Sequence, residues 1–245
     1  CQTGADHFLS SHRLLCRATH RGTGMYGPPT GRSLTYRILA DCWCRGNAVH
    51  DEWLVRDQAA IVQQMGHDIV DWTRDLIARE GGPAACVRPF TPDHDIAGPY
   101  QGRGNDHPFG RFMADVLTCV MAGHIGYWAQ VADRAVTADW PGHHTTYGHH
   151  GVQQFWLALR SAFPSAQFQI DHVIGQTSPY MPPRAALRWS LWGTHDGWGR
   201  YGKPTGAQVY VMGITHVEQG PRGLKRLWTL IDDTAIWKQI ILTTG

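Results

Sequence analysis

Long hydrophobic runs and a strong net charge are both missing from this sequence. No stretch of its 245 residues approaches 18 consecutive apolar residues, which argues against a membrane-spanning helix. The net charge is only +2 at pH 7, and the 22 basic residues are scattered rather than grouped. We therefore expect neither a nucleic-acid partner nor a membrane partner. A hydrophobic content of 42% with 17% charged residues is typical of a folded globular protein.

Cysteine pairs spaced for metal binding are also missing. Six cysteines are present, none of them in a C-x-x-C pair, and Cys42 and Cys44 would share one face of a strand. We expect buried, reduced thiols in a cytoplasmic protein, rather than a disulfide or a metal site. The sequence begins with Cys1 rather than Met, so we expect it to start inside a longer reading frame. Residues 1–19 show no signal-peptide pattern.

What the sequence does contain is an internal repeat. Residues 20–31 and 195–206 are identical at eight of 12 positions, at a constant offset of 175. The same offset joins Arg13 to Arg188, Trp53 to Trp228, Asp57 to Asp232, Ala60-Ile61 to Ala235-Ile236, and Gln64 to Gln239. Ungapped agreement over this length predicts a duplicated domain rather than a solenoid.

The second copy contains a full set of predicted elements. Apolar residues recur at helical spacing from Phe112 to Met121 and from Val152 to Phe163, which predicts two helices, and Pro164 ends the second. The expected helices cover 109–122, 149–163 and 234–242, with a short helical piece near 125–131. The expected strands, rich in β-branched and aromatic residues, cover 132–139, 167–175, 185–194, 207–218 and 224–231.

The first copy is shorter, because only 19 residues precede its His20. We expect its opening helices and first strand to lie upstream of Cys1, or another element to cover the exposed half-sheet. The chain then divides into three parts. Residues 1–66 are the C-terminal half of the first domain, and residues 109–245 are the second domain. Residues 67–108 hold a helix over 68–79 and, over 89–108, a linker or long functional loop.

Motifs within the repeat resemble a known family. They are Gly-Thr-His-x-Gly at 193–197, Pro-Thr-Gly at 204–206, Glu52-Trp53 with Asp57, and Gln64-Met65-Gly66. These segments are similar to the SnoaL-like polyketide cyclase family, within the nuclear transport factor 2-like superfamily. The resemblance covers nearly all of the second copy and the C-terminal half of the first. It implies two tandem cone-shaped α+β barrels, each with a curved sheet and helices enclosing an apolar pocket, the first without its N-terminal helices.

For function, the resemblance implies an aromatic or polycyclic small-molecule ligand, acid/base chemistry without a cofactor, and dimerisation through the outer face of the sheet. The 11 tryptophans agree with this, since they can line a pocket with flat apolar surface. Cyclases of the family use an aspartate on their last strand. The corresponding positions here, Trp53-Leu54 and Trp228-Thr229, hold no acid, so the cyclase mechanism does not carry over directly.

Histidines and aspartates kept in both copies are the first catalytic candidates. His20 and His195 lie just before glycine-rich hairpins, where an imidazole could move a proton near pH 7 or could instead hold the hairpin. Asp57 and Asp232 precede the last helix of each copy. They could act as helix N-caps, or as acids or bases whose pKa is raised by apolar neighbours.

Positions that differ between the copies provide further candidates, since a working site is expected to lose symmetry. Asp41 and His216 are such a pair, and we add both to the catalytic candidates. Arg188 shares a strand face with Trp192, where its guanidinium could hold a carboxylate or phenolate or form an ion pair in the sheet. The candidate substrate-binding residues are Arg17, Tyr36, His50, Trp53, Arg188, Trp192, Tyr201 and Trp228.

A histidine-rich loop lies before the helix predicted at 149–163. His143-His144 and His149-His150 flank Tyr147, and vicinal histidines can bind Zn²⁺ or Ni²⁺. Vicinal side chains diverge in an extended chain, however, and no acid or thiol is close in sequence. We expect a solvated loop without a metal, with His149 or His150 able to contact a substrate.

Two functions follow from these observations. The first is a cofactor-independent lyase, isomerase or aldol-type cyclase acting on a small aromatic substrate, chemistry that needs a proton acceptor and a group holding an oxyanion. The second is a non-catalytic small-molecule-binding or assembly module of the same fold. In a third arrangement, one copy binds substrate and the other is a structural lid. In each case we expect no cofactor and a homo-oligomer.

Overall fold

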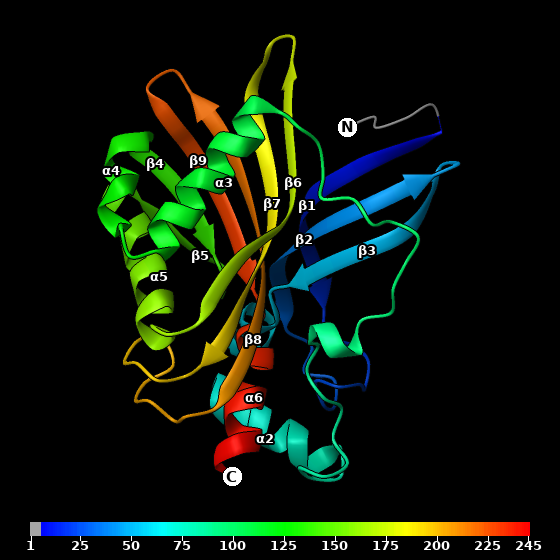
Figure 1. Cartoon of the computed structure of the whole chain (residues 1–245). Coiled ribbons are helices and arrows are strands. Elements are labelled where there is room, and N and C mark those ends of the chain that lie inside the picture. Colours follow the sequence, from blue (N-terminus) through cyan, green and yellow to red (C-terminus); the bar gives the residue numbers. More distant parts are fainter. Residues whose placement is uncertain (1–5) are drawn as a thin grey trace.

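Two sheets that pack against each other organise the chain (Figure 1). The computed structural model describes residues 6–245. The first sheet is antiparallel, with strand order β1-β2-β3, and leads into two helices. The bounds are β1 His7–Thr19, β2 Ser33–Arg45, β3 Ala48–Arg56, α1 Gln58–Gln64 and α2 Ile69–Arg79.

The second sheet is mixed, with the order β5-β4-β9-β8-β7-β6 and a parallel β4–β9 pair. Its elements are α3 Pro108–Met121, α4 Trp128–Val131, β4 Ala132–Trp140, β5 His144–Tyr147, α5 Gly148–Ala162, β6 Gln167–Ser178, β7 Met181–Thr194, β8 Gln208–Gly220, β9 Gly223–Ile231 and α6 Asp233–Thr244, with the short 3₁₀ helices η1 Pro92–His94 and η2 Ile125–Tyr127. In Figure 1, α3, α4 and α5 lie on one side of this sheet and the first sheet lies on the other, while α6 packs with α2.

The predicted elements of the second copy are confirmed to within a few residues, as is the helix expected at 68–79, which is α2. Within the second copy, the sequence did not predict β5, which forms inside the histidine-rich loop because it pairs with β4. Within residues 6–245 the histidines of that loop do not gather into a group of three possible metal ligands. No helix in this part of the chain is long and apolar enough to span a membrane.

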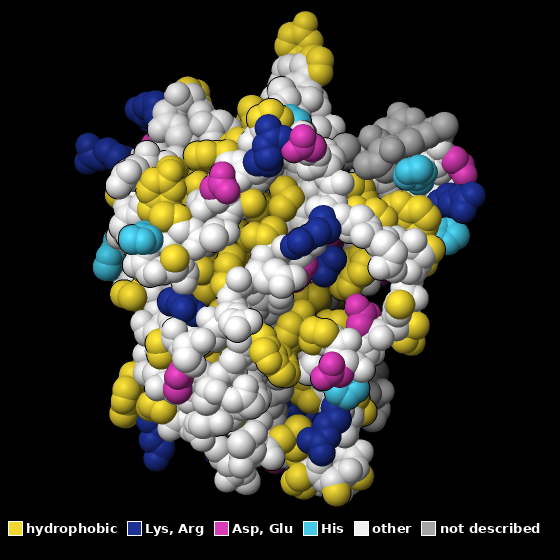
Figure 2. Space-filling view, in the orientation of Figure 1, with side chains coloured by type: hydrophobic (Ala, Val, Ile, Leu, Met, Phe, Trp, Pro, Cys, Tyr) yellow, Lys and Arg dark blue, Asp and Glu magenta, His cyan; other side chains and the backbone are white. Residues whose placement is uncertain are grey.

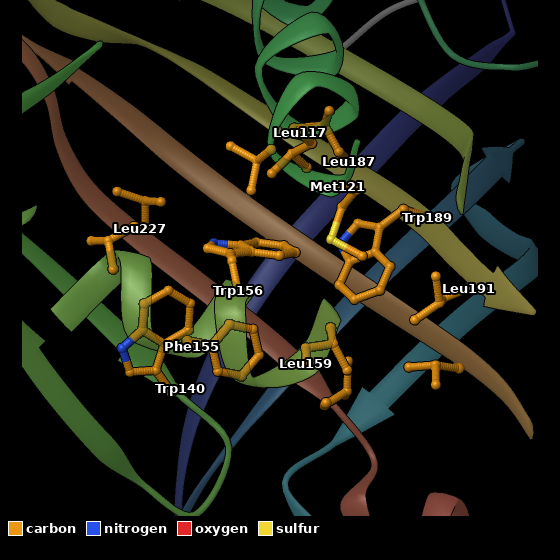
Figure 3. Packing of buried hydrophobic residues seen from close by; sticks show 14 of the residues in the cluster. Leu117, Met121, Trp140, Phe155, Trp156, Leu159, Leu187, Trp189, Leu191 and Leu227 are labelled. Carbon is orange, nitrogen blue, oxygen red and sulfur yellow. The ribbon is translucent and has the colours of Figure 1, made fainter. Parts of the chain in front are cut away.

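The space between α3, α5 and the second sheet is filled by side chains (Figure 3). Trp128, Trp156 and Trp189 are among the largest fully buried side chains. The rings of Trp156 and Trp189 lie 5.6 Å apart, and Trp140 stacks on Phe155 at 4.2 Å. Side chains packed this closely leave no room for a ligand among them. The expectation of a tryptophan-lined conical pocket is therefore wrong for this cone, because the same aromatic side chains form its core.

The two repeat segments share one backbone frame. In the first sheet Arg13 pairs with Leu39, and in the second Arg188 pairs with Ile214, which keeps the offset of 175 on both strands. The next strand pair keeps it as well, since β2 and β3 have the same register as β8 and β9 around these positions. Strand pairing therefore follows the repeat across all three strands.

A glutamine in each segment ties the last helix to the middle strand. The amide of Gln64 donates to the carbonyl of Thr35 and accepts from its N–H, both at 2.8 Å. Gln239 makes the same pair of bonds to Tyr210, at 2.9 and 2.7 Å. The shared Gln of the repeat thus has the same structural task in both places.

The contact between the sheets uses equivalent positions of the repeat. Leu39 and Val55 of the first sheet form a buried cluster with Ile214 and Leu230 of the second, and these are two repeat-equivalent pairs. The outer face of the second sheet is therefore covered by the first sheet of the same chain.

Two arginines border this contact in the same symmetric manner. The guanidinium of Arg13 lies 3.7 Å from the ring centre of Trp228, and that of Arg188 lies 4.0 Å from Trp53. Each arginine thus stacks on a tryptophan of the opposite sheet, and the two sheets are related by an approximate two-fold arrangement.

The other face of the first sheet is exposed along its edge strands β1 and β3, while the residues of its middle strand β2 are mostly buried. Helix α1 covers one end of it, where Ile61 and Met65 pack on Leu34. Further along, Leu14 and Leu54 are 47% and 37% exposed. This face is the equivalent of the one that α3 and α5 cover in the second sheet.

Candidate functional site

Two neighbouring cavities form a groove along the contact of the two sheets. We call it the inter-sheet groove. The larger cavity has a volume of about 620 Å³ and the smaller one about 320 Å³. Both are lined by Phe90 and Tyr210, whose rings lie 6.0 Å apart. Figure 2 shows hydrophobic side chains gathered along the middle of this face of the molecule, with charged side chains around them.

Aromatic side chains from both sheets form the walls of the larger cavity. Trp53 comes from β3, Trp192 from β7 and Tyr210 from β8, and Phe90 closes it from the segment that connects α2 to α3. Strand alternation explains the set on β7. Because Trp189 and its alternate neighbours face the filled core, the intervening side chains face the groove. The predicted substrate-binding residues Trp53, Arg188 and Trp192 therefore line one cavity.

Asp171 on β6 is one of three aspartates in the wall of this cavity, with Asp93 and Asp95, and the sequence did not single it out. Its Oδ1 accepts hydrogen bonds from Ser190 Oγ at 3.2 Å and from Gln169 Nε2 at 3.0 Å. Its Oδ2 is buried and has no hydrogen-bond partner among residues 6–245. Burial raises the pKa of Asp171, and the nearby Arg188 partly opposes that rise. The sequence signal that could have identified Asp171 was an acidic residue in the middle of a predicted strand.

Arg188 links the cavity to a buried polar chain behind it. Its Nε lies 3.3 Å from Oδ2 of Asp41, which is only 3% exposed. The same oxygen lies 2.8 Å from His172 Nδ1, and Nε2 of that imidazole is 2.8 Å from the hydroxyl of Tyr100. Burial raises the pKa of Tyr100. Arg188 is thereby fixed by Asp41 on one side and by the ring of Trp53 on the other.

The smaller cavity contains Asp232, which caps helix α6. Its Oδ1 accepts from Thr234 N at 3.0 Å, from Thr234 Oγ1 at 2.7 Å and from Ala235 N at 3.2 Å. Burial raises the pKa of Asp232 to about 6. Lys238, on the same cavity wall, pairs with Glu80 of the connecting segment at 2.5 Å. Asp232 thus combines a capping role with an elevated pKa in a cavity.

Asp57, the repeat equivalent of Asp232, has a structural role. It caps α1 through Ala60 N at 3.1 Å and also accepts from the backbone N–H groups of Gly142 and His143, at 2.8 and 2.9 Å. The side chain has no exposed area, and burial raises its pKa while these three donors lower it. Asp57 therefore holds the β4–β5 turn of the second sheet against the first.

Comparison with known proteins places this frame in a family. The model of the SnoaL-like polyketide cyclases matches residues 111–240, more than half of the chain. This chain belongs to the SnoaL-like polyketide cyclase family. The α+β cone expected for that family is formed by α3 to α6 and the second sheet. A search of curated proteins found no match.

Among solved structures, several that resemble this SnoaL-like chain cover about half of it. A SnoaL-like polyketide cyclase candidate from Jannaschia sp. CCS1 is 15% identical, covers 56% of this chain and 96% of its own, and has a TM-score of 0.46. IdmH, a polyketide cyclase candidate from Streptomyces antibioticus, is 15% identical, with coverages of 55% and 99% and a TM-score of 0.45. A SnoaL-like polyketide cyclase from Agrobacterium tumefaciens C58 is 16% identical, with coverages of 55% and 99% and a TM-score of 0.42.

The repeated histidines of this SnoaL-like chain hold its hairpins. His20 Nδ1 is 3.1 Å from Thr30 Oγ1, and His195 Nδ1 is 2.9 Å from Thr205 Oγ1. Their backbone N–H groups donate across the same hairpins. His195 has no exposed area, and burial lowers its pKa. Of the two alternatives for these histidines, the geometry favours the structural one.

Asp41 and His216, the divergent pair, each reach across to the opposite sheet. Asp41 contacts Arg188 and His172 as described, and His216 Nε2 is 2.9 Å from Ser11 Oγ. Burial lowers the pKa of His216 to about 3, so its imidazole is neutral at physiological pH. Both side chains thus act at the sheet contact of the SnoaL-like fold rather than inside a cone.

Five predicted substrate-binding residues lie away from the inter-sheet groove. Arg17 is on the outer part of β1 and Tyr36 packs by α1. His50 contacts the ring of Trp43 on the β2–β3 hairpin, and Trp228 stacks under Arg13. The fifth, Tyr201, is 2% exposed, and its hydroxyl donates to Asp233 at 2.7 Å. The structure does not bring these five together.

Proposed function

We propose that this chain is a cofactor-independent acid/base enzyme that acts on an aromatic or polyketide-like small molecule in the inter-sheet groove. One observation carries the proposal. Asp171 lines a 620 Å³ cavity whose walls carry aromatic rings, and its buried Oδ2 has no hydrogen-bond partner among residues 6–245. An unpartnered buried carboxyl oxygen is costly for the protein alone and is satisfied by a ligand hydroxyl or an acidic C–H.

The cavity has the parts that such a reaction needs. Trp53, Trp192 and Tyr210 give flat apolar surfaces that orient an aromatic ring. The raised pKa of Asp171 makes its carboxylate a stronger base than an ordinary aspartate, which suits a group that takes a proton and returns it. Arg188 supplies a fixed positive charge for an oxyanion that forms on the substrate. Lyase, isomerase and aldol-type cyclase reactions share this requirement.

We further propose that the chain is two tandem SnoaL-like copies, divided at residues 1–66, 67–108 and 109–245. The shared strand register and the matching hairpin and glutamine bonds support this division. On this proposal, the outer sheet face that would join two subunits is used within one chain, and the groove is a product of that intramolecular contact.

The experiment compares Asp171→Asn with Asp93→Asn, a substitution of an exposed carboxyl group on the same cavity wall. The probe is 2-tetralone, an aromatic ketone with an acidic methylene, and proton exchange with deuterated water is followed by NMR. We expect the D171N rate to fall at least about 100-fold below wild type, and the D93N rate to stay within about twofold. Equal exchange rates for D171N and wild type would refute the assignment of Asp171.

A non-catalytic binding module is the second candidate, and one contact favours it. The guanidinium of Arg188 is already held by Asp41 and Trp53, which suits a fixed binding surface as well as a reaction. Quenching of tryptophan fluorescence by 2-tetralone reports binding, since Trp53 and Trp192 line the larger cavity. Saturable quenching without any proton exchange from pH 5 to pH 9 would select the binding module over the enzyme.

A further inference from the structure

Three possible metal ligands meet on the open face of the first sheet, away from the inter-sheet groove. His12 comes from β1, Cys42 from β2 and Glu52 from β3. Cys42 pairs directly with Glu52, and His12 lies diagonally across from Cys42 because it pairs with Ala40. Side chains opposite or diagonal in an antiparallel sheet share one face and touch.

The distances within the group fit a shared ion. One ligand atom from each of His12, Cys42 and Glu52 lies within 4.8 Å of the other two, and Cys42 Sγ is 3.5 Å from Glu52 Oε1. Ligand atoms in a tetrahedral zinc site lie about 3.5 Å apart. Cys42 is buried and fixed, whereas Glu52 is exposed and His12 partly exposed, so rotation of these two side chains closes the site.

The repeat shows that the fold does not require these side chains. The equivalent positions in the second sheet are Leu187, Val217 and Leu227, which are at most 1% exposed and belong to the filled core. An imidazole, a thiol and a carboxylate have therefore replaced three core residues on adjacent strands. These three side chains share one face of the first sheet, at positions that form the packed core of the second sheet. Their chemistry therefore suits binding of a ligand better than core packing.

We propose that His12, Cys42 and Glu52 bind Zn²⁺, with water in the fourth coordination position. A nitrogen, a sulfur and an oxygen ligand are the donor set that Zn²⁺ takes from proteins. Binding replaces the thiol proton of Cys42, which is released to solvent as the Zn–S bond forms. Because the face is open to solvent, the fourth position is accessible to water or to a small anion.

The surroundings of the thiol support this assignment. Leu14 and Leu54 lie on the same face, and apolar neighbours strengthen ion–ligand bonds by excluding water.

The test titrates the full chain with Co²⁺ alone, since Co²⁺ replaces Zn²⁺ and gives a thiolate charge-transfer absorption. We expect one Co²⁺ per chain, displacement by Zn²⁺, complete loss of the thiolate band in Cys42→Ser, and at least about tenfold weaker binding in Glu52→Gln. Cys44→Ser, in the same strand, and Cys86→Ser, a buried thiol elsewhere, serve as controls and retain the band. Circular dichroism verifies that each variant is folded.

Two results would overturn the site. One is a folded wild-type chain that shows no thiolate band at saturating Co²⁺. The other is a band that survives in Cys42→Ser or disappears in Cys44→Ser. The D171N variant binds Co²⁺ like wild type, so this outcome is independent of the reaction proposed for the inter-sheet groove.

Discussion

The two repeat segments have one backbone frame and opposite interiors. In the second sheet, the inward face carries Leu187, Trp189 and Leu227, all buried under α3 and α5. In the first sheet, the equivalent face carries His12, Leu14 and Glu52 and is exposed along β1 and β3. The difference shows that strand register and hairpin geometry do not depend on whether the side chains of the sheet face are apolar and buried or polar and exposed.

The residues that specify the frame are few and lie in turns and at helix ends. Gly27 and Gly202 take equivalent left-handed conformations, with φ of 88° and 81°, which side chains with a Cβ rarely adopt. The histidine and glutamine bonds described above add to them. This explains why sequence identity between the copies is concentrated at residues 20–31 and 195–206.

The largest expected difference between the two segments is in the free energy of unfolding lost when one pair of equivalent residues is replaced by alanine. Trp189→Ala removes a fully buried indole that donates to Thr215 at 3.0 Å, and we expect it to lower the free energy of unfolding by about 4 kcal/mol. Leu14→Ala, at the equivalent but 47% exposed position, lowers it by less than about 1 kcal/mol. Urea unfolding measures both. Similar losses for the two variants would mean that the first sheet is covered in solution.

The next comparison uses pH. The pKa of Asp232 is 3.8 in an unfolded chain and about 6 when folded, so its contribution to stability is full below pH 3.8 and is lost as pH rises through 6. Asp232→Asn keeps an N-cap and removes this titration. Relative to wild type, we expect D232N to gain up to about 3 kcal/mol between pH 4 and pH 7. Urea unfolding at several pH values measures the change, with Asp93→Asn as a control. A constant difference across this range would contradict the buried titration.

The stacked arginines give a smaller contrast. The side chain of Arg188 is 12% exposed and faces a buried carboxylate, whereas that of Arg13 is 37% exposed and pairs with Glu218 at 2.6 Å. We expect Arg188→Ala to lower the free energy of unfolding by about 2 kcal/mol, and Arg13→Ala by less than about 1 kcal/mol. Equal effects in urea unfolding would show that burial of the partner carboxylate has no influence.

The smallest effects test the symmetry of the hairpins. Thr30→Val and Thr205→Val each remove the hydroxyl bound to a hairpin histidine. We expect each variant to lose about 1 kcal/mol, and the two losses to agree. Thermal unfolding of the two variants side by side measures them. A loss of stability in only one variant would mean that the histidine–threonine hydrogen bond stabilises only one of the two hairpins.

Much of the fold could be predicted from sequence because it depends on local patterns. Apolar spacing gave the helices α3 and α5, and the constant offset of the repeat gave the equivalent strands. The filled cone could not be predicted, because a sequence rich in tryptophan is equally compatible with a tryptophan-lined cavity and with a tryptophan-filled core. Only the distance between the elements decides which occurs.

The candidate site was accessible from sequence only in part. Alternation on one strand put Arg188 and Trp192 on a common face, and this holds in the larger cavity. Asp171 was missed because an acid within a predicted strand does not reveal its surroundings, which here come from β7 and from the first sheet. A groove between two sheets depends on long-range packing, which residue spacing does not encode.

The hydrogen bonds between Asp57 and the β4–β5 turn have a consequence for folding during translation. The two donors in that turn, Gly142 and His143, follow Asp57 by 85 and 86 residues. At a synthesis rate of about 5–20 residues per second, the ribosome delivers them on the order of ten seconds after the carboxylate has emerged. During that interval the contact face of the nascent first sheet is without the second sheet that covers it in the folded chain.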